Sequence, residues 1–248
     1  GRKRRTAIEN AEEAVYEEKK MEEMEVCFLM DRFGYMKLID KNAYERNKEA
    51  AHAENKFIFT CMNTDKICIF TDTGKMHTIK AVDIPLGRFR DKGTPVDNLS
   101  NYDSSQERML YVAPVGQLRS DRLLFVTKTS MCKLVEGAEF DVAKRTIAST
   151  KLADEDELIF IGSASEMEQI VLQSHGGCFL RFLAQEVSTM KKTALGVRGM
   201  KLADDDYLEH AYLLAGHQEY TISYHDKEYA LNKVRLAKRD TKGIKPRI

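Results

Sequence analysis

Three things are scarce in this sequence: long apolar runs, net charge and closely spaced cysteines. No apolar stretch approaches the roughly 18 to 20 residues needed to cross a bilayer, which excludes a membrane-spanning helix. The 39 basic residues equal the 39 acidic residues, and this balance argues mildly against a nucleic-acid-binding protein. The first residues are basic rather than apolar, so we expect no signal peptide in this sequence. Because the sequence does not begin with Met, we expect a fragment of a longer protein.

The cysteines indicate neither a zinc site nor a disulfide framework. There are five, an odd number, and no two have the spacing of a metal-binding pair. Each lies in an apolar, strand-like segment, so we expect buried free thiols in a reducing cytoplasm. They are Cys27, Cys61, Cys68, Cys132 and Cys178.

The motifs of common enzymes are also missing. The sequence has no Gly-x-x-x-x-Gly-Lys-Ser/Thr phosphate loop, no His-Glu-x-x-His zinc motif and no Gly-x-Ser-x-Gly nucleophile elbow. The six histidines show no metal-ligand spacing, and the acidic runs at 154–157 and 204–206 lack the spacing of a calcium loop. We therefore predict no catalytic residue, metal site or cofactor in this chain, and we interpret the acidic runs as solvated turns.

What the sequence does contain is a repeat. A tight turn followed by a short strand recurs about five times, at a spacing of about 40 to 56 residues that is typical of propellers and solenoids. Runs rich in Val, Ile, Phe, Tyr and Thr flank the turns, as strands prefer. The pattern predicts an all-β fold, a radial array that closes on itself and leaves no long open edge. The turns begin near Asp31, Thr71, Lys128, Ser174 and His225, and the predicted strands are 26–30, 35–39, 55–62, 66–71, 108–114, 122–127, 157–162, 169–173, 207–215 and 219–224.

The first 25 residues have a different pattern. Thr6 and Glu9 fit a capping box, and apolar residues then follow at helical spacing among many Glu and Lys. We predict a helix over residues 6–25 and two parts in the chain, a linker helix at 1–25 and a β domain at 26–248.

Positive charge gathers in the connections that follow the second strand of four repeats. The segments 87–93, 141–151, 191–201 and 233–247 are each net basic. Equivalent loops of a radial array lie at equivalent radius, so we expect a basic belt that suits a polyanion. Gly93, Gly199 and Gly243 follow the basic clusters and would permit tight turns or close approach of the backbone to phosphate. The candidate DNA-binding residues are Arg88, Arg90, Lys92, Lys144, Arg145, Lys191, Lys192, Arg198, Lys201, Arg235, Lys238, Arg239 and Lys242.

Several stretches resemble the C-terminal domain of the A-subunit of the bacterial type IIA topoisomerases, gyrase and topoisomerase IV. They are Arg4-Arg5-Thr6, the Gly74-Lys75 turn, Gly87–Gly93 with the following Thr94–Leu99, and Thr193–Leu202. The resemblance implies a β-pinwheel, a propeller-like disc of about five four-stranded blades. It also implies that the domain binds and bends double-stranded DNA around a positive rim and presents the DNA to the catalytic core, which passes one duplex through another.

The same resemblance implies what lies outside this chain. The active-site tyrosine, the metal-binding acids and the ATPase site would belong to other parts of a parent DNA topoisomerase that uses ATP and Mg2+. The partners would be the catalytic core of the A-subunit, together with the B-subunit of a heterotetramer. The isolated domain would be a monomer in the bacterial cytoplasm, associated with the nucleoid and not with a membrane.

One connection distinguishes the two enzymes. Gyrase carries a Gln-Arg-Arg-Gly-Gly-Lys/Arg-Gly box in its first blade, and the matching connection here, 44–56, has no glycine and no net charge. We therefore expect a topoisomerase IV-like domain that serves decatenation and relaxation. The alternatives are a gyrase-type wrapping domain for negative supercoiling and a non-enzymatic propeller that binds a protein, which exposed aromatic residues on a loop face would favour.

Overall fold

The computed structural model describes residues 22–248. The predicted helix over residues 6–25 lies almost entirely outside this range. Residues 22–24 have no regular structure, and the first strand begins at Glu25.

Five β-hairpins follow one another along the chain, and we call the sheet built on each hairpin a blade, numbered 1 to 5. The hairpin turns coincide with the five copies of the sequence repeat, so the repeat prediction is confirmed. The hairpins are β1 (Glu25–Met30) with β2 (Tyr35–Asp40), β4 (Lys66–Thr71) with β5 (Lys75–Lys80), β8 (Arg122–Thr127) with β9 (Met131–Glu136), β12 (Gln169–Ser174) with β13 (Phe179–Leu183), and β16 (Thr221–Tyr224) with β17 (Lys227–Ala230).

Each of the first four hairpins gains a strand on its inner side. The next long strand after the hairpin pairs with the first hairpin strand, and these inner strands contact their neighbours in adjacent blades. They are β3 (Phe57–Met62), β7 (Met109–Pro114), β11 (Leu158–Ser163) and β15 (Leu208–Leu214).

The outer edge of each blade is supplied by the next blade. After the second hairpin strand the chain crosses back and adds a very short strand to the preceding blade, so neighbouring blades are interlocked. In blade 4 a bridge between Phe179 and Ile244 takes this place. Blades 1 to 3 are therefore four-stranded, blade 4 is three-stranded and blade 5 is two-stranded among residues 22–248. The outer strands are β6 (Thr94–Pro95), β10 (Thr146–Ala148) and β14 (Val197–Arg198).

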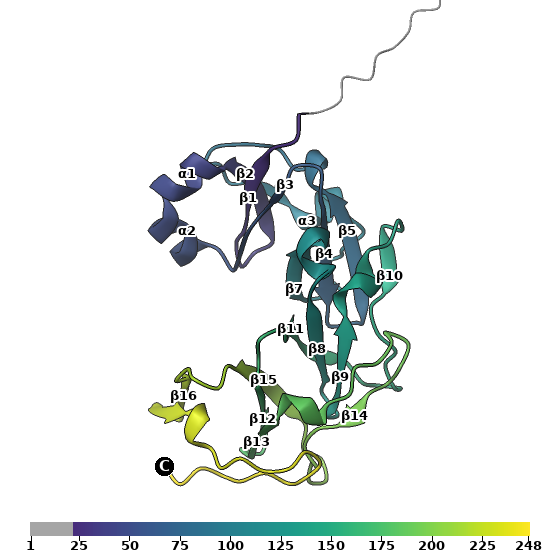
Figure 1. Cartoon of the computed structure of the whole chain (residues 1–248), viewed down its shortest axis with the longest axis vertical. Helices are drawn as coiled ribbons and strands as arrows, with labels where there is room; N and C mark the ends of the chain where they lie inside the picture. The colour runs from purple at the N-terminus through teal and green to yellow at the C-terminus, as the bar shows by residue number, and fades with distance from the viewer. Residues whose placement is uncertain (1–21) are drawn as a thin grey trace, which may run out of the picture.

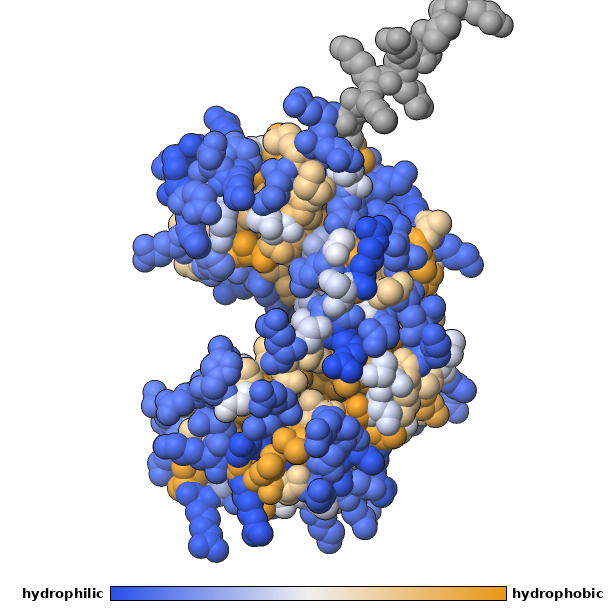
Figure 2. Space-filling view, in the orientation of Figure 1, coloured by the Kyte–Doolittle hydropathy of each residue, from blue (hydrophilic) through white to orange (hydrophobic). Residues whose placement is uncertain are grey.

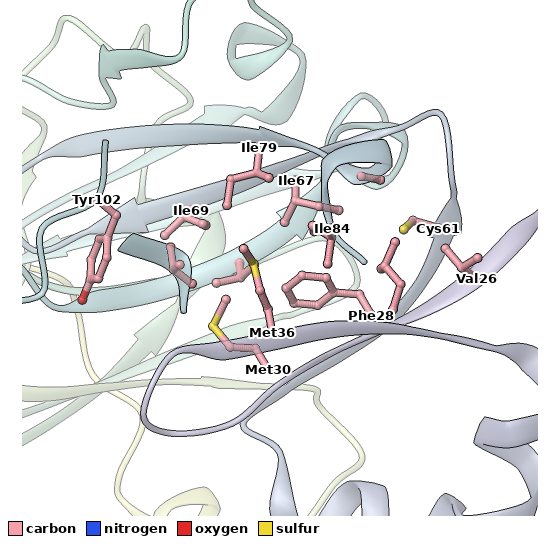
Figure 3. Close-up of a cluster of buried hydrophobic side chains, with 14 residues drawn as sticks. Val26, Phe28, Met30, Met36, Cys61, Ile67, Ile69, Ile79, Ile84 and Tyr102 are labelled. Atoms are coloured by element: carbon pink, nitrogen blue, oxygen red, sulfur yellow. The ribbon is translucent and has the colours of Figure 1, made fainter. Parts of the chain in front are cut away.

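Adjacent blades are held together by apolar layers. The alternation of the strands turns one face of each blade toward each neighbour. Between blades 1 and 2, Phe28, Met30 and Met36 pack against Ile67 and Ile69, and all five side chains are fully buried (Figure 3). Each such side chain contributes about 1.5 to 3 kcal/mol relative to exposure. Similar layers join the later blades.

The array is an open arc and not the closed ring that the sequence predicted. Figure 1 shows blades 1 and 5 at the two ends of a C, and Figure 2 shows the same notch in the molecular surface. The closed-ring prediction is wrong because two helices, α1 (Lys41–Arg46) and α2 (Lys48–Glu54), occupy the free face of blade 1. In blades 2 and 3 the corresponding face packs on the preceding blade.

These two helices were not predicted. Asp40 caps the first helix by accepting a hydrogen bond from the backbone nitrogen of Ala43, at 2.7 Å. Ala43 and Ala51 are buried against Cys27 and Leu29 of the first strand. The pair thus ends the stack of blades in the way that a terminal cap ends a solenoid.

The remaining short elements lie in the connections. They are α3 (Val96–Leu99), α4 (Val115–Leu118) and four 3-10 turns at Ala81–Asp83, Gly137–Phe140, Ala184–Glu186 and Leu231–Lys233.

All five cysteines are free thiols, and four are buried while Cys178 is half-buried. No helix in the described part of the chain is both long and apolar enough to cross a membrane.

Candidate nucleic-acid interface

The basic segments lie on the outer edge of the arc. Each begins after a 3-10 turn. The first three run to the short outer strand of the preceding blade, and the fourth runs to the bridge between Phe179 and Ile244. We call these four segments the crossing loops. The inner strands contact one another, so the crossing loops lie at the opposite, outer edge of each sheet. The crossing loops are residues 84–93, 141–145, 187–196 and 234–243.

The first, third and fourth crossing loops share one local shape. Each contains a tight turn that opens on an exposed basic residue, namely Arg88, Lys191 or Lys238. Since the three turns stand at equivalent positions in three blades, the three positive charges recur along the rim. The closing hydrogen bonds are Asp91 N to Arg88 O at 3.0 Å, Ala194 N to Lys191 O at 3.0 Å, and Thr241 Oγ1 to Lys238 O at 2.7 Å.

A glycine ends each of these three loops for a steric reason. Gly93, Gly196 and Gly243 have positive φ angles of 89°, 107° and 73°. A Cβ atom on any of them would lie 2.5 to 2.6 Å from a backbone oxygen of the preceding blade. The prediction for Gly199 is therefore wrong in position, because Gly196 is the equivalent residue. Gly93, Gly196 and Gly243 thus allow the backbone of the crossing loop to pack closely against the backbone of the preceding blade.

Two lysines, Lys133 and Lys37, hold the turns from within; Lys133 is buried and Lys37 is half-buried. The Lys133 side chain is 1% exposed, and its Nζ donates to the carbonyl oxygens of Lys192 at 2.9 Å and Ala194 at 2.6 Å. Burial lowers the pKa of Lys133 from 10.5 to about 8. In blade 1, Lys37 makes the same two bonds to the carbonyl oxygens at the equivalent positions 89 and 91. Sequence reasoning missed both, although a lysine within an apolar strand was the available signal.

The second crossing loop departs from this pattern. Thirteen residues separate β5 from β6 and β13 from β14, whereas nine separate β9 from β10. By strand register Thr146 stands where the other loops have glycine. The guanidinium of the preceding Arg145 donates to the carbonyl oxygen of Leu99 at 3.2 Å. His77 replaces the buried lysine and contacts Thr146 Oγ1 at 2.9 Å.

His77 also contacts a buried carboxylate. Its Nε2 lies 3.0 Å from Glu107 Oε2, and the hydroxyl of Thr71 donates to Glu107 Oε1 at 2.8 Å. Burial opposes ionisation of Glu107, but the hydrogen bonds from His77 and Thr71 outweigh it and hold its pKa below the usual range. The second crossing loop is thus anchored by a polar network in place of an ammonium group.

The predicted DNA-binding residues fall into two groups. In the first group, five side chains contact the protein itself. Arg198 pairs with Asp240 through Nε at 2.5 Å, and Arg239 donates to the carbonyl oxygens of Glu186 and Arg198. Arg88 forms an ion pair with Asp91, and the guanidinium of Arg145 donates to the carbonyl oxygen of Leu99. The ammonium group of Lys92 lies over the ring of Tyr35. In the second group no ion pair forms within residues 22–248: Arg90, Lys144, Lys191, Lys192, Lys201, Arg235, Lys238 and Lys242.

The acidic runs have a structural role in the turns before β11 and β15. Glu155 and Asp205 have positive φ angles of 61°, and the next aspartates clasp hairpin turns of the same blade. Asp156 accepts from the Thr129 hydroxyl at 2.6 Å, and Asp206 accepts from the backbone nitrogen of Gly176 at 2.8 Å. The interpretation of these runs as turns is confirmed. The two acidic runs therefore lie in turns outside the crossing loops. For this reason a chain with no net charge can have a basic rim.

Interlocked four-stranded blades in an arc, with basic crossing loops on the outer edge, define a β-pinwheel. Comparison with known families gives the same class. The sequence matches the family described as "DNA gyrase C-terminal domain, beta-propeller" at residues 65–104, 121–165 and 168–215, which together exceed half of the chain. The chain belongs to this family, which confirms the resemblance and the fold class drawn from the sequence.

Relatives and solved structures agree with this assignment. The DNA gyrase A-subunit of Clostridium acetobutylicum is 28% identical over 210 residues, which cover 80% of this chain and 25% of the relative. The chain thus spans about a quarter of that protein. The C-terminal domain of a DNA topoisomerase IV superposes with a TM-score of 0.79 at 22% identity, covering 90% of this chain and 73% of that one. A DNA gyrase A C-terminal domain gives 0.59 at 18% identity, covering 89% and 76%.

Proposed function

We propose that this domain binds duplex DNA along its outer rim, bends it, and presents it to the catalytic core of a type IIA DNA topoisomerase. The observation that carries the proposal is the recurrence of Arg88, Lys191 and Lys238 at equivalent turns of three crossing loops. Recurring cations on a convex edge match a repeating phosphate backbone. Contacts of this kind position DNA without reading its sequence. We expect weak sequence preference and strong salt dependence.

The experiment is a titration of a short duplex at several salt concentrations. Each phosphate contact contributes about −0.9 to the slope of log K against log salt for duplex DNA. Replacing Arg88, Lys191 and Lys238 with Ala should therefore reduce the slope by up to about 2.7. If the wild-type domain does not bind at low salt, or its affinity does not depend on salt, the proposal fails.

A matched control variant removes the same number of positive charges from positions outside the crossing loops. Arg46, Lys48 and Lys227 are also exposed and form no ion pair within the described residues, and they lie on α1, on α2 and in blade 5. Changing these three to Ala removes the same charges. The control should keep a slope close to that of the wild type, and an equal loss in both variants would show that only net charge matters.

We further propose the topoisomerase IV type of parent enzyme. The position of the gyrase box is occupied by α1 and α2, which cover the free face of blade 1. This supports a path for DNA that ends at blade 1 and does not continue around a closed disc. The parent would act with the B-subunit, using ATP and Mg2+ for decatenation and relaxation. A full-length enzyme with this domain that introduces negative supercoils into relaxed plasmid would overturn the assignment.

The rival hypothesis, a propeller that binds a protein partner, would be favoured by aromatic side chains gathered on one loop face. Among the described residues the large exposed aromatic side chains are Phe33 and Tyr220. They belong to blade 1 and to the segment before β16, at opposite ends of the arc. This separation favours the nucleic-acid interface.

A further inference from the structure

We propose that a hollow on the rim, between blades 2 and 3, seats one backbone phosphate group of the bound duplex. This inference rests on the proposed function and adds a defined site to it. The hollow has a volume of about 620 Å³. Its lining contains three lysines, three threonines and no acidic residue: Lys144, Thr146, Thr150, Lys151, Lys192 and Thr193.

The hollow lies where the second crossing loop is short. That connection has nine residues, and its counterparts after β5 and β13 have 13. The basic turn found in the other crossing loops is therefore missing there. The lining also includes Ile147 and Ala148 of the outer strand β10, while Lys192 and Thr193 come from the third crossing loop. The rim is therefore concave at the second crossing loop.

The wall of the hollow is held rigidly by Lys192. Its carbonyl oxygen accepts from the backbone nitrogen of Lys151 at 3.1 Å and from Lys133 Nζ at 2.9 Å. Its backbone nitrogen donates to Glu139 Oε1 at 3.3 Å. Because hydrogen bonds fix the Lys192 backbone on both sides, its side chain extends from a fixed point in the lining of the hollow. Such preorganisation reduces the entropy lost on binding.

The chemistry of the lining favours a phosphate oxygen. Ammonium groups are point-charge donors that bind phosphate from several directions. The Thr146 hydroxyl is already engaged by His77 and Asn101, and the Thr150 hydroxyl donates to a backbone oxygen. The Thr193 hydroxyl has no hydrogen bond within the described residues and adds a neutral donor.

The number of phosphates in the hollow can be counted from salt slopes. If Lys144, Lys151 and Lys192 share one phosphate, the triple Ala variant should lose about 0.9 in slope, and each single variant less. If each lysine binds its own phosphate, the losses should add to about 2.7 and the hollow is not one site. An unchanged slope in the triple variant would equally overturn the inference. Lys48→Ala serves as the off-site control.

The outcomes separate the inference from the function on which it rests. If the wild-type domain does not bind duplex, the proposed function itself is refuted. If the wild-type domain binds, but the salt slope of the triple variant is unchanged or falls by the sum expected for three phosphates, only the inference about the hollow is refuted. Thermal unfolding of every variant, compared with wild type, shows whether the fold is retained.

A second measurement distinguishes a DNA phosphate from a free anion. Backbone amide signals of Lys192 and Thr193 are followed by NMR while duplex, or inorganic phosphate at the same ionic strength, is added. We expect these signals to shift at duplex concentrations that saturate binding, and the shift of Thr193 to vanish in the triple variant. Shifts with inorganic phosphate and none with duplex would identify a small-anion site and overturn the inference.

Discussion

Replacing Lys133 with Met should change how the stability of the domain depends on pH. The Lys133 side chain is fully buried, and its ammonium group lies 5.6 Å from the centre of the Phe125 ring. Methionine has a similar length and no charge, so it removes the ionisable group while filling most of the same space. The two carbonyl oxygens that Lys133 holds, on Lys192 and Ala194, lose their donor in the variant.

The sign follows from the lowered pKa. Between about pH 8 and 10.5 the folded protein has released the Lys133 proton while the unfolded chain still holds it. The free energy of unfolding of the wild type therefore rises with pH in this window. With one pKa unit equal to about 1.4 kcal/mol, the contribution of Lys133 grows by about 2 kcal/mol between about pH 7 and 9.5. The Met variant lacks this contribution.

Other groups titrate in the same window with the opposite sign. Burial raises the pKa of Cys27 to about 11 and those of Cys61, Cys68 and Cys132 to about 12. Their thiols stay protonated in the folded state above the pH at which the unfolded chain loses the protons, so stability falls. Both proteins contain these cysteines, and their effect cancels in the difference between them.

The measurement is urea unfolding of both proteins at pH 7, 8, 9 and 9.5, with Lys144→Met as the exposed control. The difference in free energy of unfolding, wild type minus Lys133→Met, should increase by about 2 kcal/mol across the series. The control difference should stay constant. Parallel curves for wild type and Lys133→Met would refute the claim that a buried ammonium group holds the third crossing loop.

Three further predictions concern the crossing loops and their anchors. Gly196→Ala places a side chain against a backbone oxygen at positive φ and should cost more than about 1 kcal/mol in urea unfolding; an unchanged midpoint would contradict the steric argument. Asp240→Asn releases Arg198 and should tighten duplex binding at low salt, whereas weaker binding would mean that the ion pair builds the interface. Glu107→Gln should lower stability by about 1 to 3 kcal/mol at neutral pH. That deficit should shrink as the pH falls below about 4.5, because the stabilisation from a lowered pKa is lost on protonation, and a constant deficit would argue against this role.

The hairpins and the location of the positive charge follow from local features of the sequence. Alternating apolar residues on both sides of a turn such as Asp72-Thr73-Gly74 are local signals, and the ten predicted strands are all present with ends shifted by at most two residues. The basic segments were found for the same reason, because charge composition is readable without coordinates. The family resemblance also depended only on such ordered stretches.

The way the blades are joined and the place where the array ends depend on contacts between residues that are distant in the sequence. The exchanged strands β6, β10 and β14 have two or three residues, too few for any periodicity to appear. Their position is set by contacts with a different blade, such as Gly196 against the Cys132 backbone. The helices α1 and α2 gain their stability from burying Ala43 and Ala51 against β1, since isolated helices of this length are unstable in water. Contacts between residues distant in sequence leave no local pattern, and so the open arc, the bonds from Lys133 to the third crossing loop and the rim hollow could not be predicted from the sequence.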